Sequence, residues 1–313
     1  MTLRLVGDIG GTNARFALSE NGGAPYGEAK LPGADFPGPI EAAEAYLAGR
    51  PVEEAVLAVA TPVLEDEVAF TNSPWRFSIE EAKRRLGVGR LAIINDFVAQ
   101  ASAVPHLAPG ETRELKGGGA TAGAPCVVLG PGTGLGVAFL IHAGGGARVL
   151  PSEAGHASFA PQDALQEEVL RRLRVTHGGH VSLERVLSGP GLLHLARIIG
   201  EVQGRPVELA SPTDVSARAA AGDCPACGEA LRVFSAVLGA AAGSLALTVL
   251  ADGGVFVTGG LCRNLGPLLD VEAMRASFTG KGRFAGYLEG VPVTQVMRPH
   301  SGLLGAAAWH IEG

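Results

Sequence analysis

Short apolar runs alternate with glycine-rich turns along the first part of the chain. Arg4–Asp8 and Ala14–Leu18 have the apolar character of two buried strands, and only five residues separate them. The turn between them contains Gly10 and Gly11, which are free to take positive φ. The pattern therefore predicts that the chain opens with a β-hairpin.

The same arrangement returns in the middle of the chain. Cys126–Leu129 and Leu135–Ile141 read as two strands, and the turn Gly130–Gly134 between them again contains a threonine. A strand, a threonine-containing glycine turn and a second strand thus occur twice, which indicates an internally duplicated fold. Hairpins at the head of each half also exclude a plain doubly wound Rossmann unit.

Other apolar runs add strands and helices to both halves. Further buried strands are predicted at Ala55–Val59, Leu91–Ile94 and Val255–Val257. Helical spacing predicts helices at Glu41–Leu47, from a Ser78 cap to Leu86, and at Phe97–Ala103, Leu165–Leu173, Leu192–Ile199, Val215–Ala220 and Leu231–Leu250. The stretch Lys116–Pro125, rich in Gly, Ala and Pro, separates the halves. This alternation indicates an α/β protein with mixed sheets.

Composition and charge narrow the class of partner. With 47% hydrophobic and 18% charged residues among 313, the chain can bury a large core. The net charge of −6 gives no electrostatic footprint for nucleic acid or an anionic membrane. Val233–Ala251 lacks charge, but its Ser, Thr and Gly residues favour a buried central helix over a membrane span. The first residues contain no signal-peptide pattern, so a cytoplasmic protein is expected.

Three glycine turns follow apolar strands, at Gly7–Asn13, Gly130–Gly134 and Thr258–Gly260. Glycine lets backbone N–H groups approach an anion closely, and threonine hydroxyls add donors. One such turn alone would be interpreted as an ordinary hairpin turn, but three in one chain favour phosphate binding. Beside a phosphate, Asp8 is suited to hold Mg²⁺ through water. The chain has no P-loop, dinucleotide or protein-kinase motif.

An ordered set of segments that spans nearly the whole chain resembles the bacterial glucokinases of the sugar kinase/heat-shock cognate/actin superfamily. These segments are Leu5–Arg15, Ile94–Phe97, Val128–Gly136, Glu153–His156 with Phe159–Pro161, Glu184–Gly191, Gly254–Gly260 and Gly302–Gly305. The chain departs from the family pattern at Ala154, where glycine is more usual, and at Cys262–Asn264. The resemblance therefore implies no adenine contact for Cys262–Asn264.

The resemblance implies a two-lobed ribonuclease H-like/actin-like ATPase fold, with mixed sheets flanked by helices and a cleft between the lobes. Residues 1–105 with 298–313 would form the small lobe, and 106–297 the large one. The implied activity is that of a glucokinase, which uses ATP and Mg²⁺ to convert glucose to glucose 6-phosphate. The implied nucleotide-binding residues are Gly7, Asp8, Ile9, Gly10, Gly11, Thr12, Asn13, Gly132, Thr133, Gly134, Gly259 and Gly260, with Asp8 also near the metal.

The same resemblance points to the acid–base and sugar-binding residues. A kinase needs a group that takes the proton from the attacking hydroxyl, and a carboxylate at a strand end is well placed for this. Asp96 is the expected general base, with Asn95 as a sugar contact, although an Asn-Asp pair before a helix is more often an N-cap. Glu153, His156 and Glu184 are the other expected sugar contacts, where surface Glu residues and a structural His are the alternative.

Several alternatives stay open on the sequence alone. The chain could phosphorylate mannose, fructose or an N-acetylhexosamine instead of glucose, and the donor could be polyphosphate or ADP. A sugar-sensing repressor is disfavoured, because the acidic chain starts at the first phosphate strand and leaves no room for a DNA-binding domain. Cys224 and Cys227 could bind zinc with His177 and His180, but two cysteines packing at a helix start is the favoured interpretation. A homodimer is the default expectation.

Overall fold

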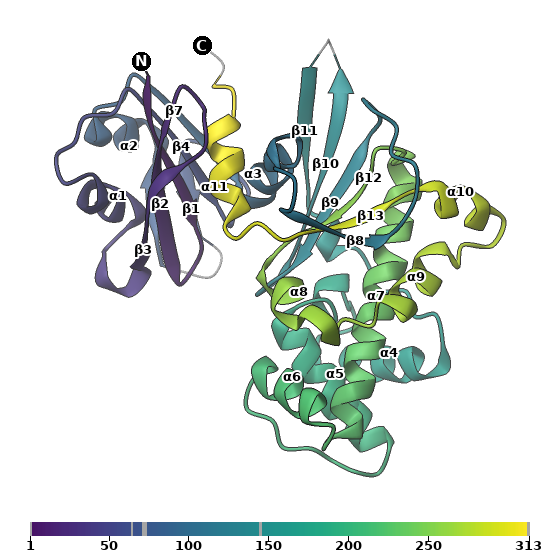
Figure 1. Ribbon diagram of the computed structural model, residues 1–313. Coiled ribbons are helices and arrows are strands. Elements are labelled where there is room, and N and C mark those ends of the chain that lie inside the picture. The colour runs from purple at the N-terminus through teal and green to yellow at the C-terminus, as the bar shows by residue number, and fades with distance from the viewer. Residues whose placement is uncertain (1, 64, 71–73, 144–145, 312–313) are drawn as a thin grey trace. The chain divides into compact units, whose positions relative to one another are not determined.

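A computed structural model describes residues 2–63, 65–70, 74–143 and 146–311 of the chain. The fold divides into two compact units, the first formed by Met1–Pro109 with Arg298–Gly313 and the second by Gly110–Met297 (Figure 1). The C-terminal segment therefore returns to the unit that the N-terminus begins. The first boundary lies at Pro109, four residues beyond the position expected from the sequence.

A five-stranded sheet forms the centre of the first unit, in the order β3-β2-β1-β4-β7. Its strands are β1 (Leu3–Ile9), β2 (Asn13–Glu20), β3 (Tyr26–Pro32), β4 (Glu54–Val59) and β7 (Arg90–Asn95). β1, β2 and β3 are antiparallel neighbours, whereas β1, β4 and β7 run parallel. All six residues of β4 are buried, as expected for a central parallel strand that is covered on both faces.

Helices cover both faces of this sheet (Figure 1). The first unit contains α1 (Pro39–Leu47), α2 (Ile79–Leu86), α3 (Asp96–Ala103), α11 (Ser301–Ala308) and the short hairpin β5 (Glu67–Ala69) and β6 (Arg76–Ser78). The apolar sides of α1 and α2 join a core cluster with β1, β2 and β4. α3 and α11 pack together so closely that a Cβ on Gly305 would overlap the carbonyl oxygen of Ala99.

The second unit repeats this sheet topology. Its order is β11-β10-β9-β12-β13-β8, with antiparallel pairs from β11 to β9 and parallel pairs from β9 to β13. The strands are β8 (Thr112–Lys116), β9 (Cys126–Pro131), β10 (Leu135–Ala143), β11 (Gly146–Ser152), β12 (Gly254–Val257) and β13 (Val293–Val296). Five of them match β3-β2-β1-β4-β7 in order and direction, and β8 is added at the edge. The internal duplication predicted from the two hairpins is confirmed.

The helices of the second unit gather around one long apolar helix. They are α4 (Ala164–Thr176), α5 (Gly189–Val202), α6 (Pro212–Ala221), α7 (Pro225–Val249), α8 (Gly260–Leu265), α9 (Val271–Thr279) and α10 (Ala285–Gly290). By length and composition α7 could cross a membrane, but most of it is buried inside the structure. It packs against α5, α6 and α9 (Figure 1). The prediction of a buried central helix is confirmed.

Two local features of the fold go beyond what the sequence indicates. Gly10 and Gly11 are free to take positive φ, but neither does so in this turn. The turn closes instead through the Gly10 N–H, which donates to the Asn13 carbonyl oxygen at 3.0 Å. In addition, β3 and β11 extend the two predicted hairpins, although most of their residues are exposed or half-buried and carry no apolar pattern.

Candidate active-site residues

In the first unit, the expected base and metal ligand lie at the same edge of the sheet. The parallel register pairs Ile9 of β1 with Val59 of β4, and Val59 with Asn95 of β7. The carboxyl ends of these strands therefore meet where ligands bind in parallel sheets. Asp8 precedes Ile9, and Asp96 begins the helix that follows Asn95. The fold thus gathers at one edge residues that are far apart in sequence.

The Asn95-Asp96 pair divides the role of helix cap unequally. Oδ1 of Asn95 accepts hydrogen bonds from the N–H groups of Phe97 at 2.9 Å and Val98 at 3.4 Å, which makes Asn95 the N-cap of α3. Asp96 is the first residue of the helix, and its Oδ1 also lies 2.9 Å from the Phe97 nitrogen. Both side chains thus accept from the Phe97 N–H, and Asn95 reaches Val98 as well, which makes Asn95 the main cap.

Asp8 lies in a buried setting next to the start of α11. A Cβ on Gly302 would stand 3.4 Å from Cγ of Asp8. Burial raises the pKa of the Asp8 carboxyl, while the charges of Arg15 and His300 act in the opposite direction. A raised folded-state pKa means that folding disfavours the ionised form, so this group stabilises the fold below its unfolded pKa and loses that contribution as pH rises. Ionisation of Asp8 therefore costs stability.

The glycines of the first turn serve two purposes. Gly7 is buried within β1, where a Cβ would lie 2.8 Å from Leu57 and 3.1 Å from Phe16. Its lack of a side chain is therefore a packing requirement inside the sheet. Gly10, by contrast, has only the Asn13 carbonyl oxygen within 4 Å of a built Cβ, at 3.7 Å. Gly10 is exposed enough to present its backbone to a ligand.

In the second unit, the other two glycine turns lie side by side. β9 and β12 are parallel neighbours, and the Thr258 N–H donates to the Leu129 carbonyl oxygen at 2.8 Å. Gly259 takes a φ of 92°, and a Cβ there would also come within 2.8 Å of the Pro131 carbonyl oxygen. A side chain at Gly259 is thus excluded by both conformation and space. Gly132, at the tip of the neighbouring turn, faces open space.

The expected sugar contact Glu184 lies against the second glycine turn. Its Oε2 accepts a hydrogen bond from the Leu135 N–H at 3.0 Å and packs directly against Gly134. Glu184 belongs to a short 3₁₀ helix, Leu183–Arg185, just before α5. A carboxylate expected to hold sugar is thus fixed by the backbone of a turn expected to hold phosphate.

Glu153 and His156 lie next to the same residue, Leu135. Both side chains are more than half exposed, with 3.8 Å between Oε2 of Glu153 and Nε2 of His156. They flank Gly155, where a Cβ would overlap the Leu135 carbonyl oxygen. Leu135 therefore donates its N–H to Glu184, while its carbonyl oxygen lies close against Gly155 of the Glu153–His156 loop. The structure brings these three polar residues to one region of the second unit.

The residues considered for zinc do not assemble into a site. Cys224 caps α7 and accepts a hydrogen bond from the Cys227 N–H at 3.3 Å, and both cysteines are buried. His180 lies 3.2 Å from the His156 carbonyl oxygen, whereas the ring of His177 faces His194. Within residues 2–63, 65–70, 74–143 and 146–311, no three His, Cys, Asp or Glu residues could hold a metal ion.

Unlike the residues considered for zinc, Asp8 and the glycine turns suit Mg²⁺. Magnesium dehydrates reluctantly and is often bound through one or two carboxylates together with waters and substrate phosphates. Asp8, at the end of a strand and beside an exposed glycine turn, provides one such carboxylate. Open space at Gly10 in the first unit, and separately at Gly132 in the second, leaves room for a phosphate to approach each turn. The residues present therefore fit both ATP and a magnesium ion held mainly by water and phosphate.

Comparison with known proteins identifies the family. The sequence model of the glucokinase family matches residues 5–312. The chain belongs to the glucokinase family. A glucokinase from Aromatoleum aromaticum is 43% identical over 311 residues, which cover 97% of this chain and 93% of that protein. The resemblance noted in the sequence motifs is confirmed.

Solved structures place this glucokinase-family chain in the same fold group. A crystal structure of a glucokinase from an Antarctic psychrotroph is 38% identical, covers 98% of both chains and has a TM-score of 0.88. A ROK-family glucokinase from Streptomyces griseus, solved with glucose and AMPPNP, has a TM-score of 0.63 at 22% identity. It covers 97% of this chain and 98% of that one, and shows the fold alone. The α/β fold of the sugar kinase/actin type is confirmed.

Sequence reasoning missed the surroundings of Asp8. Ser301 donates a hydrogen bond to Gln100 at 2.5 Å, which ties the first residue of α11 to α3. His300, just before it, has a φ of 50° and pairs with Glu28 of β3, with 2.5 Å between Nδ1 and Oε1. In the sequence, the only signal for these contacts was the segment Gly302–Gly305, which matches the family pattern but contains no polar side chain.

Proposed function

We propose that this glucokinase-family chain transfers the γ-phosphoryl group of ATP to the 6-hydroxyl of glucose and releases glucose 6-phosphate and ADP. Family membership supports the reaction type. The observation that supports its mechanism is the position of Asp96, which begins α3 at the carboxyl edge of the parallel strands directly after Asn95, the N-cap of that helix.

In the proposed reaction, Asp96 accepts the proton of the 6-hydroxyl as its oxygen attacks the γ-phosphorus. A bond forms between that oxygen and phosphorus, and the bond from phosphorus to the β–γ bridging oxygen breaks, so the electron pair leaves with ADP. Such a transition state needs positioning and charge neutralisation more than covalent chemistry. The remaining residues are assigned to those two tasks.

Glucose would be held by polar side chains. Asn95 retains its amide nitrogen as a donor, because its oxygen is used for the cap. Glu184, Glu153 and His156 supply acceptors and a donor for the other hydroxyls, and their common link to Leu135 supports a shared role. A carboxylate that already accepts one backbone N–H is fixed in direction, which favours selective binding of a hydroxyl pair.

The nucleotide would be held by backbone N–H groups of the glycine turns. Gly10 and Gly132 offer open space for phosphate oxygens, with Thr12 and Thr133 as hydroxyl donors beside them. Mg²⁺, when bound, would neutralise charge on the phosphates. Asp8 is the residue proposed to hold that ion through water, and its buried carboxylate gains a favourable partner when a cation is near.

Replacing Asp96 by Asn tests this mechanism. The amide can still accept hydrogen bonds, so glucose should bind within about tenfold of wild type, a change of roughly 1.4 kcal/mol or less. It cannot take a proton, and a positioned general base contributes roughly 10²–10⁴-fold, so kcat should fall by about that factor. Asp35→Asn, the same change at an exposed position of the first unit, is the matched control. A folded Asp96→Asn protein with near-normal kcat would remove Asp96 from the mechanism.

Substrate range and donor follow from the same assay. A coupled assay with glucose, mannose, fructose and N-acetylglucosamine, each with ATP, polyphosphate or ADP, should give the highest kcat/KM for glucose with ATP. A higher value for another hexose would assign the chain to that sugar.

We also infer that the protein is cytoplasmic and forms a homodimer. The buried position of α7 supports the location, because this helix is packed inside the protein. The homodimer is the default expectation for oligomers.

A further inference from the structure

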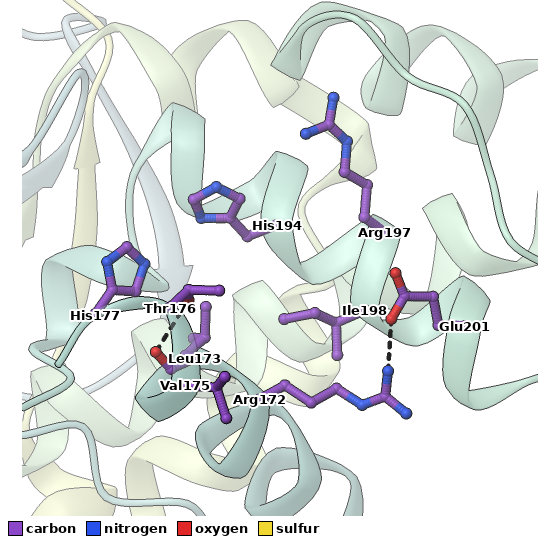
Figure 2. Close-up of a pocket in the computed structure, with 9 residues that line it drawn as sticks. All are labelled: Arg172, Leu173, Val175, Thr176, His177, His194, Arg197, Ile198 and Glu201. Atoms are coloured by element: carbon purple, nitrogen blue, oxygen red, sulfur yellow. Dashed lines mark hydrogen bonds and ion pairs between the residues drawn. The ribbon is translucent and has the colours of Figure 1, made fainter. Parts of the chain in front are cut away.

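A pocket lies within the second unit, between α4 and α5, and none of the residues that line it is proposed for catalysis or substrate binding (Figure 2). Its volume is about 400 Å³, within the range of small-molecule sites. The walls are formed by Arg172, Leu173, Val175, Thr176, His177, His194, Arg197, Ile198 and Glu201. At its rim, Val175 is 80% exposed, so the pocket opens to the surface.

Two histidine nitrogens in this pocket have no partner. His177 ends α4, His194 lies in α5, and their ring centroids are 5.9 Å apart (Figure 2). Nε2 of His177 and Nδ1 of His194 are both buried, and neither makes a hydrogen bond within the part of the chain that the structure describes. A buried polar atom without a partner is unfavourable, because it has lost its hydrogen bonds to water and gained none in return. The pair therefore indicates a polar group of a ligand.

The charges around the two rings favour an anion. Arg172 on α4 is held by Glu201 at 2.5 Å, so these two charges largely offset each other. Arg197 donates to the Leu209 carbonyl oxygen, an uncharged partner, and its positive charge is not offset there. Arg185, from the segment before α5, adds a further positive charge that acts on both histidines. The balance of charge near the rings is positive.

The protonation of the two histidines fits the same ligand. Burial lowers the pKa of both His177 and His194, so both rings are neutral at pH 7. A neutral imidazole carries one N–H, which can reside on Nε2 of His177 and Nδ1 of His194. Two N–H donors directed at one carboxylate or phosphate would satisfy both buried nitrogens at once.

The rest of the pocket is apolar. Leu173, Val175 and Ile198 cover its walls, and they suit a hydrocarbon body better than a hydrated ion. We propose that the α4–α5 pocket binds a small organic anion, with a carboxylate or phosphate head between His177 and His194 and an apolar body against these three side chains. A metal ion fits less well, because the two imidazoles lack a third protein ligand among the described residues.

Calorimetry on the wild-type protein tests the proposal without any substitution. Hexanoate and hexyl phosphate should each bind with one-to-one stoichiometry, and the tighter of the two identifies the preferred head group. Acetate, which lacks the apolar body, and 1-hexanol, which lacks the charge, should bind at least about tenfold more weakly, equivalent to about 1.4 kcal/mol. Absence of saturable binding by both anions, or equal binding of 1-hexanol, would overturn the proposal.

Substitution then locates the site. His177→Leu and His194→Leu should each weaken binding of the preferred anion by roughly tenfold, the scale of one lost hydrogen bond to a charged group. His142→Leu, at an exposed position on β10, should leave it unchanged. In the wild-type protein, the ¹⁵N resonances of the His177 and His194 rings should shift on titration while that of His142 stays. Binding that moves neither ring would place the anion elsewhere and refute the assignment.

Discussion

Replacing Gly134 by Ala should weaken glucose binding, although Gly134 lies in a turn proposed to hold phosphate. A Cβ at this position would overlap Oε2 of Glu184 and come within 3.2 Å of its Cδ. Gly134 is not among the residues with positive φ, so alanine adds no backbone strain. The effect of the substitution should therefore come from displacement of the Glu184 carboxylate.

The size of the effect follows from the contact that is lost. To make room, the carboxylate must leave the position in which it accepts the Leu135 N–H at 3.0 Å. A hydrogen bond to a charged group contributes about 1.5–3 kcal/mol. If that bond fixes Glu184 for a glucose hydroxyl, its loss should weaken glucose binding by roughly 10- to 150-fold at about 1.4 kcal/mol per tenfold.

Calorimetry with glucose and no nucleotide separates this effect from any change in ATP binding. Gly132→Ala is the matched control, because it places the same methyl group in the same turn with no atom within 4 Å. It should bind glucose as the wild type does. A folded Gly134→Ala protein with unchanged glucose affinity would show that Glu184 does not position the sugar, and would remove it from the proposed site.

Three other substitutions test the remaining parts of the first unit. Glu54→Gln should destabilise the fold by about 3–5 kcal/mol in urea unfolding, because Glu54 is buried between the guanidinium groups of Arg4 and Arg90, and an unchanged midpoint would contradict this. Asp8→Asn should raise the thermal midpoint at pH 7, since it removes a carboxylate whose ionised form is disfavoured by burial, and it should raise the Mg²⁺ concentration needed for half-maximal activity; a lower midpoint would contradict the direction of the pKa shift. Asn95→Ala should cost about 1 kcal/mol of stability through loss of the α3 cap, and a neutral result would return capping to Asp96.

The parts of the fold that sequence could predict are those with a local physical signal. The two hairpins have continuous buried strands, and the helix after Ser78 has a cap, acids in its first turn and a glycine at its end. β3 and β11 were missed because they are edge strands of their sheets with mainly exposed side chains, so neither alternation nor an apolar run marks them. β13 is as short as β12, four residues, but its sequence Val-Thr-Gln-Val lacks the continuous apolar run that marked β12.

The roles of the candidate site residues stay predictions, but the contacts between those residues could not be predicted from the sequence at all. Asp8 and Asp96 were proposed because each follows an apolar strand, and ligands bind at the carboxyl ends of parallel strands. The hydrogen bond from Leu135 to Glu184 joins residues 49 apart in sequence, and nothing local to either one indicates the other. His300 beside Glu28 is a still more distant pairing that brings the last helix to the first strands. Such contacts depend on tertiary packing, which no local pattern encodes.

The glycine turns show how one motif can combine two unrelated constraints. At Gly130 a Cβ would lie 2.6 Å from the Thr258 carbonyl oxygen, so this glycine is needed where two strands approach closely, with or without a nucleotide. At Gly132 the same Cβ would meet nothing within 4 Å, so packing gives no reason for glycine there. The N–H groups of Gly132 and Gly10 donate within their own turns, to the carbonyl oxygens of Gly134 at 2.7 Å and Asn13 at 3.0 Å. The open space at these two glycines leaves room for a phosphate to approach each turn, and that room, rather than the glycine content of the motifs, supports nucleotide binding.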